Sequence, residues 1–181
     1  NKFAIVGSYI QLAMVAGLAP LGRAEDPPFR EVLSKLKPKS PLETLDCFQV
    51  RDGFRVELVC AEPMVNDPIA IDWGADGRLW VVEMGDYPQG GDGGGAAARG
   101  CIKYLADQDG DGRYDRSQVF VDDLNFPTGV MPWRNGVLIT CPPDILYAED
   151  TDGDGTADRR EVLYRGFVEG NPQHRVNGVR W

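Results

Sequence analysis

The feature that most constrains the fold is an acidic nine-residue segment that occurs twice. It reads DQDGDGRYD at 107–115 and DTDGDGTAD at 150–158, so the two copies start 43 residues apart. Each copy carries aspartate at its first, third, fifth and ninth places and glycine at its fourth and sixth. Two such segments in register indicate a structural repeat, because a chance turn would not recur with the same spacing and flanks.

Short alternating runs around both segments predict strands. Residues 54–59 alternate apolar and polar side chains. Asp76-Gly77 and Asn135-Gly136 are hairpin signals. The other predicted strands are 69–73, 78–84, 128–133 and 137–141, and one more lies on each side of the second acidic segment. About four strands in a unit of this length are typical of a β-propeller blade. We therefore expect an all-β protein that is an N-terminal fragment, about two to three blades, of a propeller with six blades when complete.

The first residues predict export. Residues 1–24 have a basic start, an apolar stretch and the small-x-small site Gly22-Arg23-Ala24, as in a secretory signal peptide. The alternative is an uncleaved N-terminal anchor, so any membrane association is peripheral or through that segment. Residues 25–46 are interpreted as a linker and a short helix that starts at Ser40-Pro41, and 47–181 as the partial propeller domain. The Gly- and Ala-rich run 88–100 is interpreted as a flexible loop.

Charge and cysteine content narrow the function. The net charge is −9 and no acidic residue precedes Glu25, so the domain itself is strongly acidic. Such a surface argues against nucleic acid, which is bound through Lys and Arg. The four cysteines pair in an exported protein in any of three ways, or serve as small buried apolar groups. They are Cys47, Cys60, Cys101 and Cys141.

The acidic segments resemble calcium loops. Calcium takes six to eight oxygen ligands, which a D-x-D-x-D-G loop supplies from alternate places. The predicted ligands are Asp107, Asp109, Asp111 and Asp115 in the first loop and Asp150, Asp152, Asp154, Asp158 and Glu161 in the second. The twelfth place is Glu161 in the second loop but Gln118 in the first, which predicts a tighter second site. The alternative is a pair of solvated turns that bind no metal.

Beyond the loops, the chain resembles a known family. GFRVELVCAEPMVNDPIAIDW at 53–73 and LNFPTGV at 124–130, together with the loops, resemble planctomycete and verrucomicrobial proteins described as membrane-bound dehydrogenases. The resemblance covers residues 40–181. It implies an exported propeller related to the quinoprotein glucose/sorbosone dehydrogenases, followed in many members by a c-type haem domain.

The resemblance also implies site residues. His174 is the expected catalytic base, and Arg175 and Arg180 are expected to face an anionic quinone such as pyrroloquinoline quinone. The implied reaction oxidises a sugar- or alcohol-type substrate and passes electrons to a quinone and then to a haem domain or partner. Haem is expected only if a further part of the protein carries it. Glu83, Asp86 and Tyr87 are expected to line a pocket. The alternative functions are a non-catalytic extracellular propeller that binds polysaccharide or protein, and a calcium-dependent hydrolase or lactonase on the same fold.

Overall fold

The structure is a computed structural model that describes Glu31, Lys35, residues 37–85, Tyr87 and residues 100–180. The predicted signal peptide 1–24 and most of the loop 88–100 lie outside the described residues. The chain forms two compact units, Asn1–Gln49 and Val50–Trp181. Among the residues that the structure describes, none belongs to a helix long and apolar enough to cross a membrane.

In the first unit, the short helix α3 spans Pro41–Leu45. Its capping box confirms the predicted start. The Glu43 backbone N–H donates to Ser40 Oγ at 3.3 Å, and the Ser40 N–H donates to the Glu43 carboxylate at 2.8 Å. These bonds satisfy two donors that a helix start leaves without partners, and they lower the pKa of the exposed Glu43 carboxyl.

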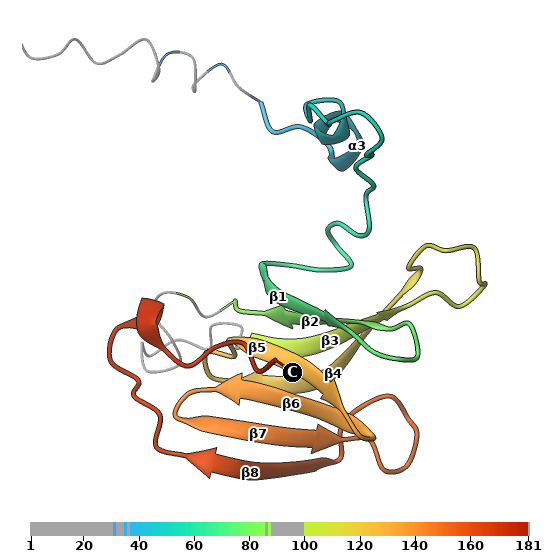
Figure 1. The fold of residues 1–181 in the computed structure, drawn as a ribbon. Coiled ribbons are helices and arrows are strands. Elements are labelled where there is room, and N and C mark those ends of the chain that lie inside the picture. Colours follow the sequence, from blue (N-terminus) through green and yellow to red (C-terminus); the bar gives the residue numbers. More distant parts are fainter. Residues whose placement is uncertain (1–30, 32–34, 36, 86, 88–99, 181) are drawn as a thin grey trace, which may run out of the picture. The chain divides into compact units, whose positions relative to one another are not determined.

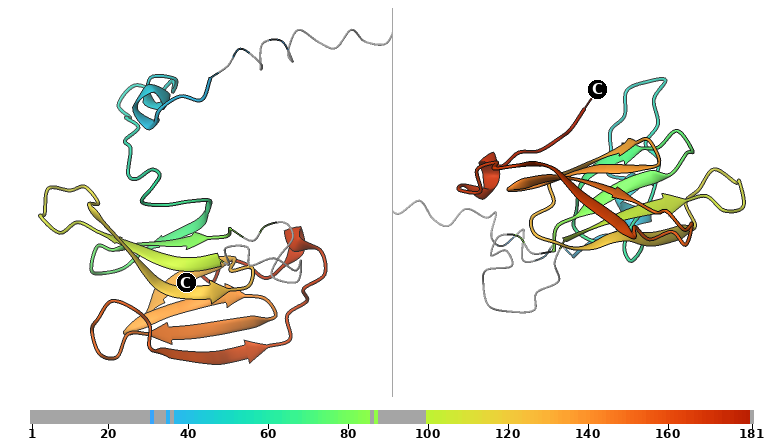
Figure 2. Two further views of the ribbon diagram at one scale, coloured as in Figure 1. Left: turned by 180° about the vertical axis from the view of Figure 1, so that it is seen from behind. Right: turned by 90° about the horizontal axis from the view of Figure 1, so that it is seen from below.

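The second unit is all-β and contains two four-stranded antiparallel sheets, shown in Figures 1 and 2. The first sheet has the order β1-β2-β3-β4 and the second β5-β6-β7-β8, so each is a meander of consecutive strands. The strands are β1 Pro68–Trp73, β2 Leu79–Glu83, β3 Gly100–Ala106, β4 Arg116–Leu124, β5 Gly129–Trp133, β6 Gly136–Cys141, β7 Asp144–Glu149 and β8 Arg159–Arg165.

The meanders explain the 43-residue spacing of the acidic loops. Residues 107–115 join β3 to β4, and residues 150–158 join β7 to β8, so both loops connect the third strand to the fourth. Both lie at the end of their sheet that also carries its first hairpin turn, as Figure 1 shows. The chain after β8 runs at the opposite end.

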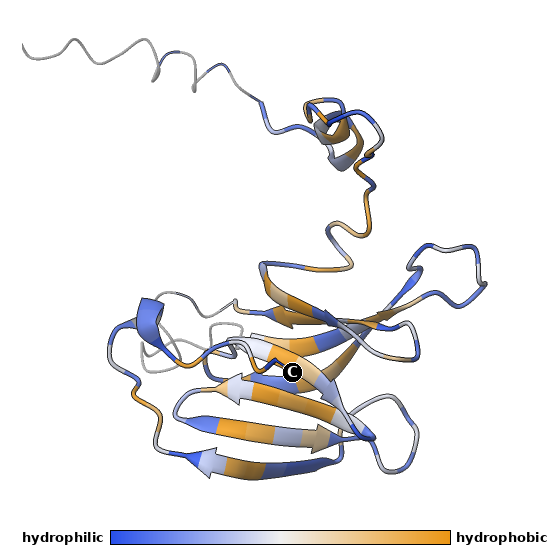
Figure 3. Ribbon diagram, viewed as in Figure 1, coloured by the Kyte–Doolittle hydropathy of each residue, from blue (hydrophilic) through white to orange (hydrophobic). Residues whose placement is uncertain are grey.

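The two sheets share one apolar core. It contains Trp80, Ile102 and Phe120 from the first sheet and Val137 and Ile139 from the second, all nearly inaccessible to solvent. β5 packs against β1 and β2, so the first strands of the two sheets are neighbours. Figure 3 shows the apolar stretches along these strands.

Each sheet has two different faces, and the unlike faces meet in the core. We call face A the side of the first sheet formed by Trp80, Val82, Ile102, Tyr104 and Phe120, and face B its other side, formed by Leu79, Val81 and Leu105. Strand register and the 43-residue shift place Leu138, Thr140, Ile145, Tyr147 and Leu163 on face A of the second sheet. Its face B then consists of Val137, Ile139 and Ala148. Face A of the first sheet therefore packs on face B of the second.

One predicted strand is wrong. The backbone of residues 54–59 forms no strand, although the six other predicted strand regions do. A strand needs a neighbour that accepts and donates its hydrogen bonds, and neither sheet includes this segment. Its apolar residues Phe54, Val56 and Leu58 are exposed.

Candidate functional site

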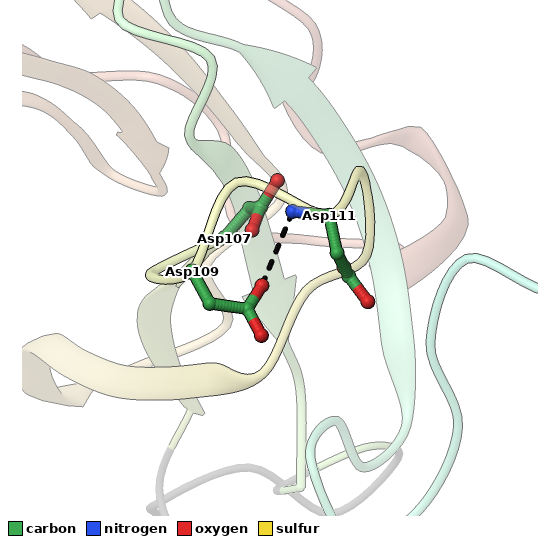
Figure 4. Close-up of side chains that lie close together, drawn as sticks. All are labelled: Asp107, Asp109 and Asp111. Carbon is green, nitrogen blue, oxygen red and sulfur yellow. Dashed lines mark hydrogen bonds between the residues drawn. The ribbon is translucent and has the colours of Figure 1, made fainter.

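The first acidic loop brings three carboxylates together. One oxygen each of Asp107, Asp109 and Asp111 lies within 4.8 Å of the others, and all three residues are exposed (Figure 4). The backbone folds around the first aspartate, whose two carboxylate oxygens accept from the Gly110 N–H at 2.7 Å and the Gly112 N–H at 2.9 Å. Gly110 and Gly112 have φ of +78° and +89°, a conformation that favours glycine.

These donors fix the charge of the loop. The Gly112 N–H, followed by other backbone donors, lowers the pKa of the Asp107 carboxyl below its ordinary value. The carboxylate therefore stays ionised at neutral pH although other carboxylates stand close to it. Three carboxylate groups in one small loop form a hard, all-oxygen donor set of the kind that calcium prefers.

The second loop repeats this geometry. Asp150, Asp152 and Asp154 each contribute an oxygen to a second group within 4.8 Å. The Asp150 carboxylate accepts from the Gly153 N–H at 2.6 Å and the Gly155 N–H at 2.9 Å, and the Gly155 bond is the main cause of its lowered pKa. Equal bonds at equal places show that the sequence pattern itself determines the loop conformation.

The loops differ in how they are supported. The second loop packs on the neighbouring sheet, where the buried Ala157 donates its N–H to the Phe120 carbonyl at 2.8 Å. The buried Gly155 lies beside the Tyr104 hydroxyl. In the first loop, Tyr114 instead donates its hydroxyl to the Gly77 carbonyl at 3.1 Å. The second loop thus belongs to the contact between the sheets, whereas the first is more exposed.

The remaining predicted ligands lie outside the two groups of three. Asp115 accepts from the Gln108 N–H at 3.1 Å. Asp158 accepts from the Thr151 hydroxyl at 2.6 Å, the main cause of its lowered pKa. Glu161 lies on β8 and pairs with Arg159 at 3.0 Å. Asp115 and Asp158, at the ninth place of their loops, therefore each form a hydrogen bond with the residue at the second place of the same loop, Gln108 or Thr151.

The residues expected to form a quinone site differ in their surroundings. His174 is exposed at the end of the 3-10 helix η2, Pro172–His174. The Arg175 guanidinium stacks on the Phe126 ring at 4.0 Å, and its Nε donates to the Glu169 carbonyl at 2.9 Å. Arg180 forms an ion pair with Asp72 of β1 at 3.2 Å. The two arginines thus contact different neighbours, and the buried Nη1 atom of Arg175 has no hydrogen-bond partner among the described residues.

Glu83, which was expected to line a pocket, instead belongs to a buried group of polar side chains. Glu83 is buried, and its carboxylate pairs with Lys103 Nζ at 2.8 Å and accepts from the Asn66 N–H at 2.7 Å. The Cys101 thiol donates to the same carboxylate at 3.5 Å. The sequence did not predict that Lys103 and Cys101 contact Glu83. The only feature that pointed to this group was the glutamate itself, at the end of the apolar run LWVV. Of the other expected pocket residues, Tyr87 is exposed and Asp86 lies outside the described residues.

All four cysteines carry thiol groups in this structure. Cys141 is buried and Cys60 half-buried, as expected of small apolar groups, whereas Cys47 is exposed. Burial, followed by the Glu83 charge, raises the pKa of the Cys101 thiol to about 12.

The fold and loops thus define an all-β protein with two repeated acidic loops. Residues 40–181 match the family model of a domain of unknown function, DUF7133, and the chain belongs to that family. No curated protein and no solved structure matches the chain.

Proposed function

We propose that this chain is part of an exported, calcium-stabilised β-propeller, and that its two acidic loops are the calcium sites. The observation that carries the proposal is that the two loops occupy the same position in their sheets and form the same hydrogen bonds. Each follows the third strand of its sheet, and each gathers three carboxylates under two glycine N–H donors. A bound cation would offset the repulsion between these charges and hold the outer strands.

The packing of unlike faces supports the propeller part of the proposal. Face A on face B is a head-to-tail arrangement, which repeats from one sheet to the next. The neighbouring first strands, β1 and β5, are also expected where blades surround a central axis. A sandwich of two sheets would not require the chain to repeat with a fixed period.

Calcium binding is tested by thermal unfolding of the chain with and without a chelator. We expect calcium to raise the melting temperature, because a ligand that binds only the folded state stabilises it. Calorimetric titration should show two sites, the second loop binding more tightly, since Ala157 and Gly155 hold it against the first sheet. Asp107→Asn and Asp150→Asn should each remove one site.

The matched control is Asp76→Asn, which removes an exposed carboxylate outside both loops. It should leave both sites in place. A melting temperature that does not respond to calcium or chelator would contradict the proposal. Equal affinities in the two loops would contradict only the predicted order.

The activity that the resemblance adds is oxidation of a sugar- or alcohol-type substrate, with a quinone and then a haem domain or partner as acceptors. The exposed imidazole of His174 supports it, as does the adjacent Arg175, whose buried Nη1 atom has no hydrogen-bond partner among the described residues. The alternative is a non-catalytic propeller that binds polysaccharide or protein.

One assay separates the two functions. The protein is incubated with pyrroloquinoline quinone and calcium, and dye reduction is followed over a panel of sugars and alcohols. Dehydrogenase function predicts substrate-dependent reduction that His174→Ala abolishes and that Gln173→Ala, the matched neighbour, leaves unchanged. Absence of reduction in folded protein, together with retention on a polysaccharide column, would favour the binding function.

A further inference from the structure

Face B of the first sheet is apolar and open along β1, unlike its counterpart in the second sheet. Ile71 is 41% exposed, whereas Val130, which occupies the equivalent position in β5, is 3% exposed because face A of the first sheet covers it. Trp73 is also exposed on this face. A cavity of about 180 Å³ lies here, lined by Val59, Cys60, Val65, Pro68, Ile71, Trp73, Leu79 and Val81.

Two hydrogen bonds, one in each sheet, show what lies beside the fourth strand on this face. Between the two sheets, Arg160 of β8 donates to the Asp122 carbonyl of β4 at 3.0 Å, so it contacts the fourth strand of the neighbouring sheet. Ser117 occupies the place of Arg160 in the first sheet, and its hydroxyl donates to the Met64 carbonyl at 2.8 Å. Met64 therefore stands where the fourth strand of another sheet would run.

The residues before Met64 have the sequence of such a strand. Residues 54–59 alternate, β1 follows them as β5 follows β4, and their apolar side chains are exposed. Cys60, Met64 and Val65 pack on face B of the first sheet, much as Leu124 packs in the core that contains face B of the second sheet. The segment thus has the sequence pattern and the chain position of a fourth strand, but no neighbouring strand among the described residues.

We infer that residues 54–59 complete a further four-stranded sheet whose other three strands dock on face B of β1–β4. The partner is a three-stranded antiparallel sheet that presents the apolar pattern of face A and has an unpaired outer edge. This partner repeats the contact that already joins the two sheets. The inference extends the proposed propeller and does not depend on calcium.

The first test is amide hydrogen exchange on the protein purified from its natural host. Strand pairing predicts that amides in 55–59 exchange at least about 100-fold more slowly than in an unstructured peptide. Exchange at the unstructured rate would overturn the inference. The measurement is repeated with chelator, so that failure of calcium binding and failure of strand pairing are distinguished.

A pair of prolines provides the second test. In an edge strand, alternate N–H groups face the neighbouring strand and solvent, so proline is tolerated at every other position. Val56→Pro and Glu57→Pro should therefore differ: one lowers the melting temperature of the host-purified protein by several degrees, and the other leaves it unchanged. Equal effects of the two substitutions would overturn the inference.

Discussion

At the scale of single residues, the surroundings of each cysteine predict its reactivity. The thiolate is the reactive form, and a pKa of about 12 leaves Cys101 with only about 10⁻⁴ of its thiol ionised at pH 8. Cys47 is exposed and should react first. We expect alkylation with iodoacetamide, followed by peptide mass spectrometry, to label Cys47 rapidly and Cys101 last.

The Glu83→Gln variant separates the causes of the raised pKa of Cys101. Removing the carboxylate charge should lower that pKa and accelerate labelling, but burial is the larger cause and keeps it above 9.0. Ser117→Ala, a hydroxyl loss elsewhere in the same sheet, should leave the rate unchanged. Labelling of Cys101 as fast as Cys47 in the unaltered protein would contradict this account.

At the scale of elements, the hairpin at Asn135-Gly136 shows how far the sequence determined the structure. The turn was correctly located, but it uses Arg134, with φ of +56°, and Asn135, because Trp133 pairs with Gly136. Gly136 is needed for a different reason. A Cβ there would overlap the Ala148 carbonyl of the neighbouring strand β7.

That overlap predicts the cost of a single methyl group. Gly136→Ala should destabilise the protein by about 1–3 kcal/mol, because the Ala148 backbone cannot move without disturbing the β6–β7 pairing. Gly170→Ala is the matched control, since its Cβ would lie at an ordinary 3.7 Å from Val168. Urea unfolding measures both. Similar urea midpoints for the two variants would show that the β7 backbone moves to accommodate the added methyl group.

The elements that the sequence did predict are those with local signals. The capping box at Ser40 and Glu43 and the loops at Asp107 and Asp150 are formed by hydrogen bonds between residues at most five apart, so the sequence pattern suffices. The unpaired segment 54–59 was mispredicted because alternation reports a propensity and not a partner. For contacts between distant residues, such as Glu83 with Lys103, the sequence pattern points at most to one partner, here the glutamate that ends the apolar run LWVV, and not to the lysine.

At the scale of the whole second unit, the shared core predicts that the two sheets unfold together. Phe120 lies on β4, yet its ring packs edge-on against Trp80 at 4.8 Å within the core that Val137 and Ile139 complete from the other sheet. Its carbonyl also accepts the Ala157 N–H of the second acidic loop. Removing this ring weakens the support of both sheets.

Phe120→Ala should therefore cost about 3–5 kcal/mol, and the loss should appear equally in both sheets. Hydrogen exchange measures it separately in β3 and in β6, whose most protected amides should lose the same free energy of opening. Val119→Ala is the matched control, because this neighbour on the same strand is 38% exposed and lies outside the shared core. A loss confined to β3 would mean that each sheet is stable by itself. Equal losses would show that the contact of face A with face B, rather than either meander, is the unit of stability in this fold.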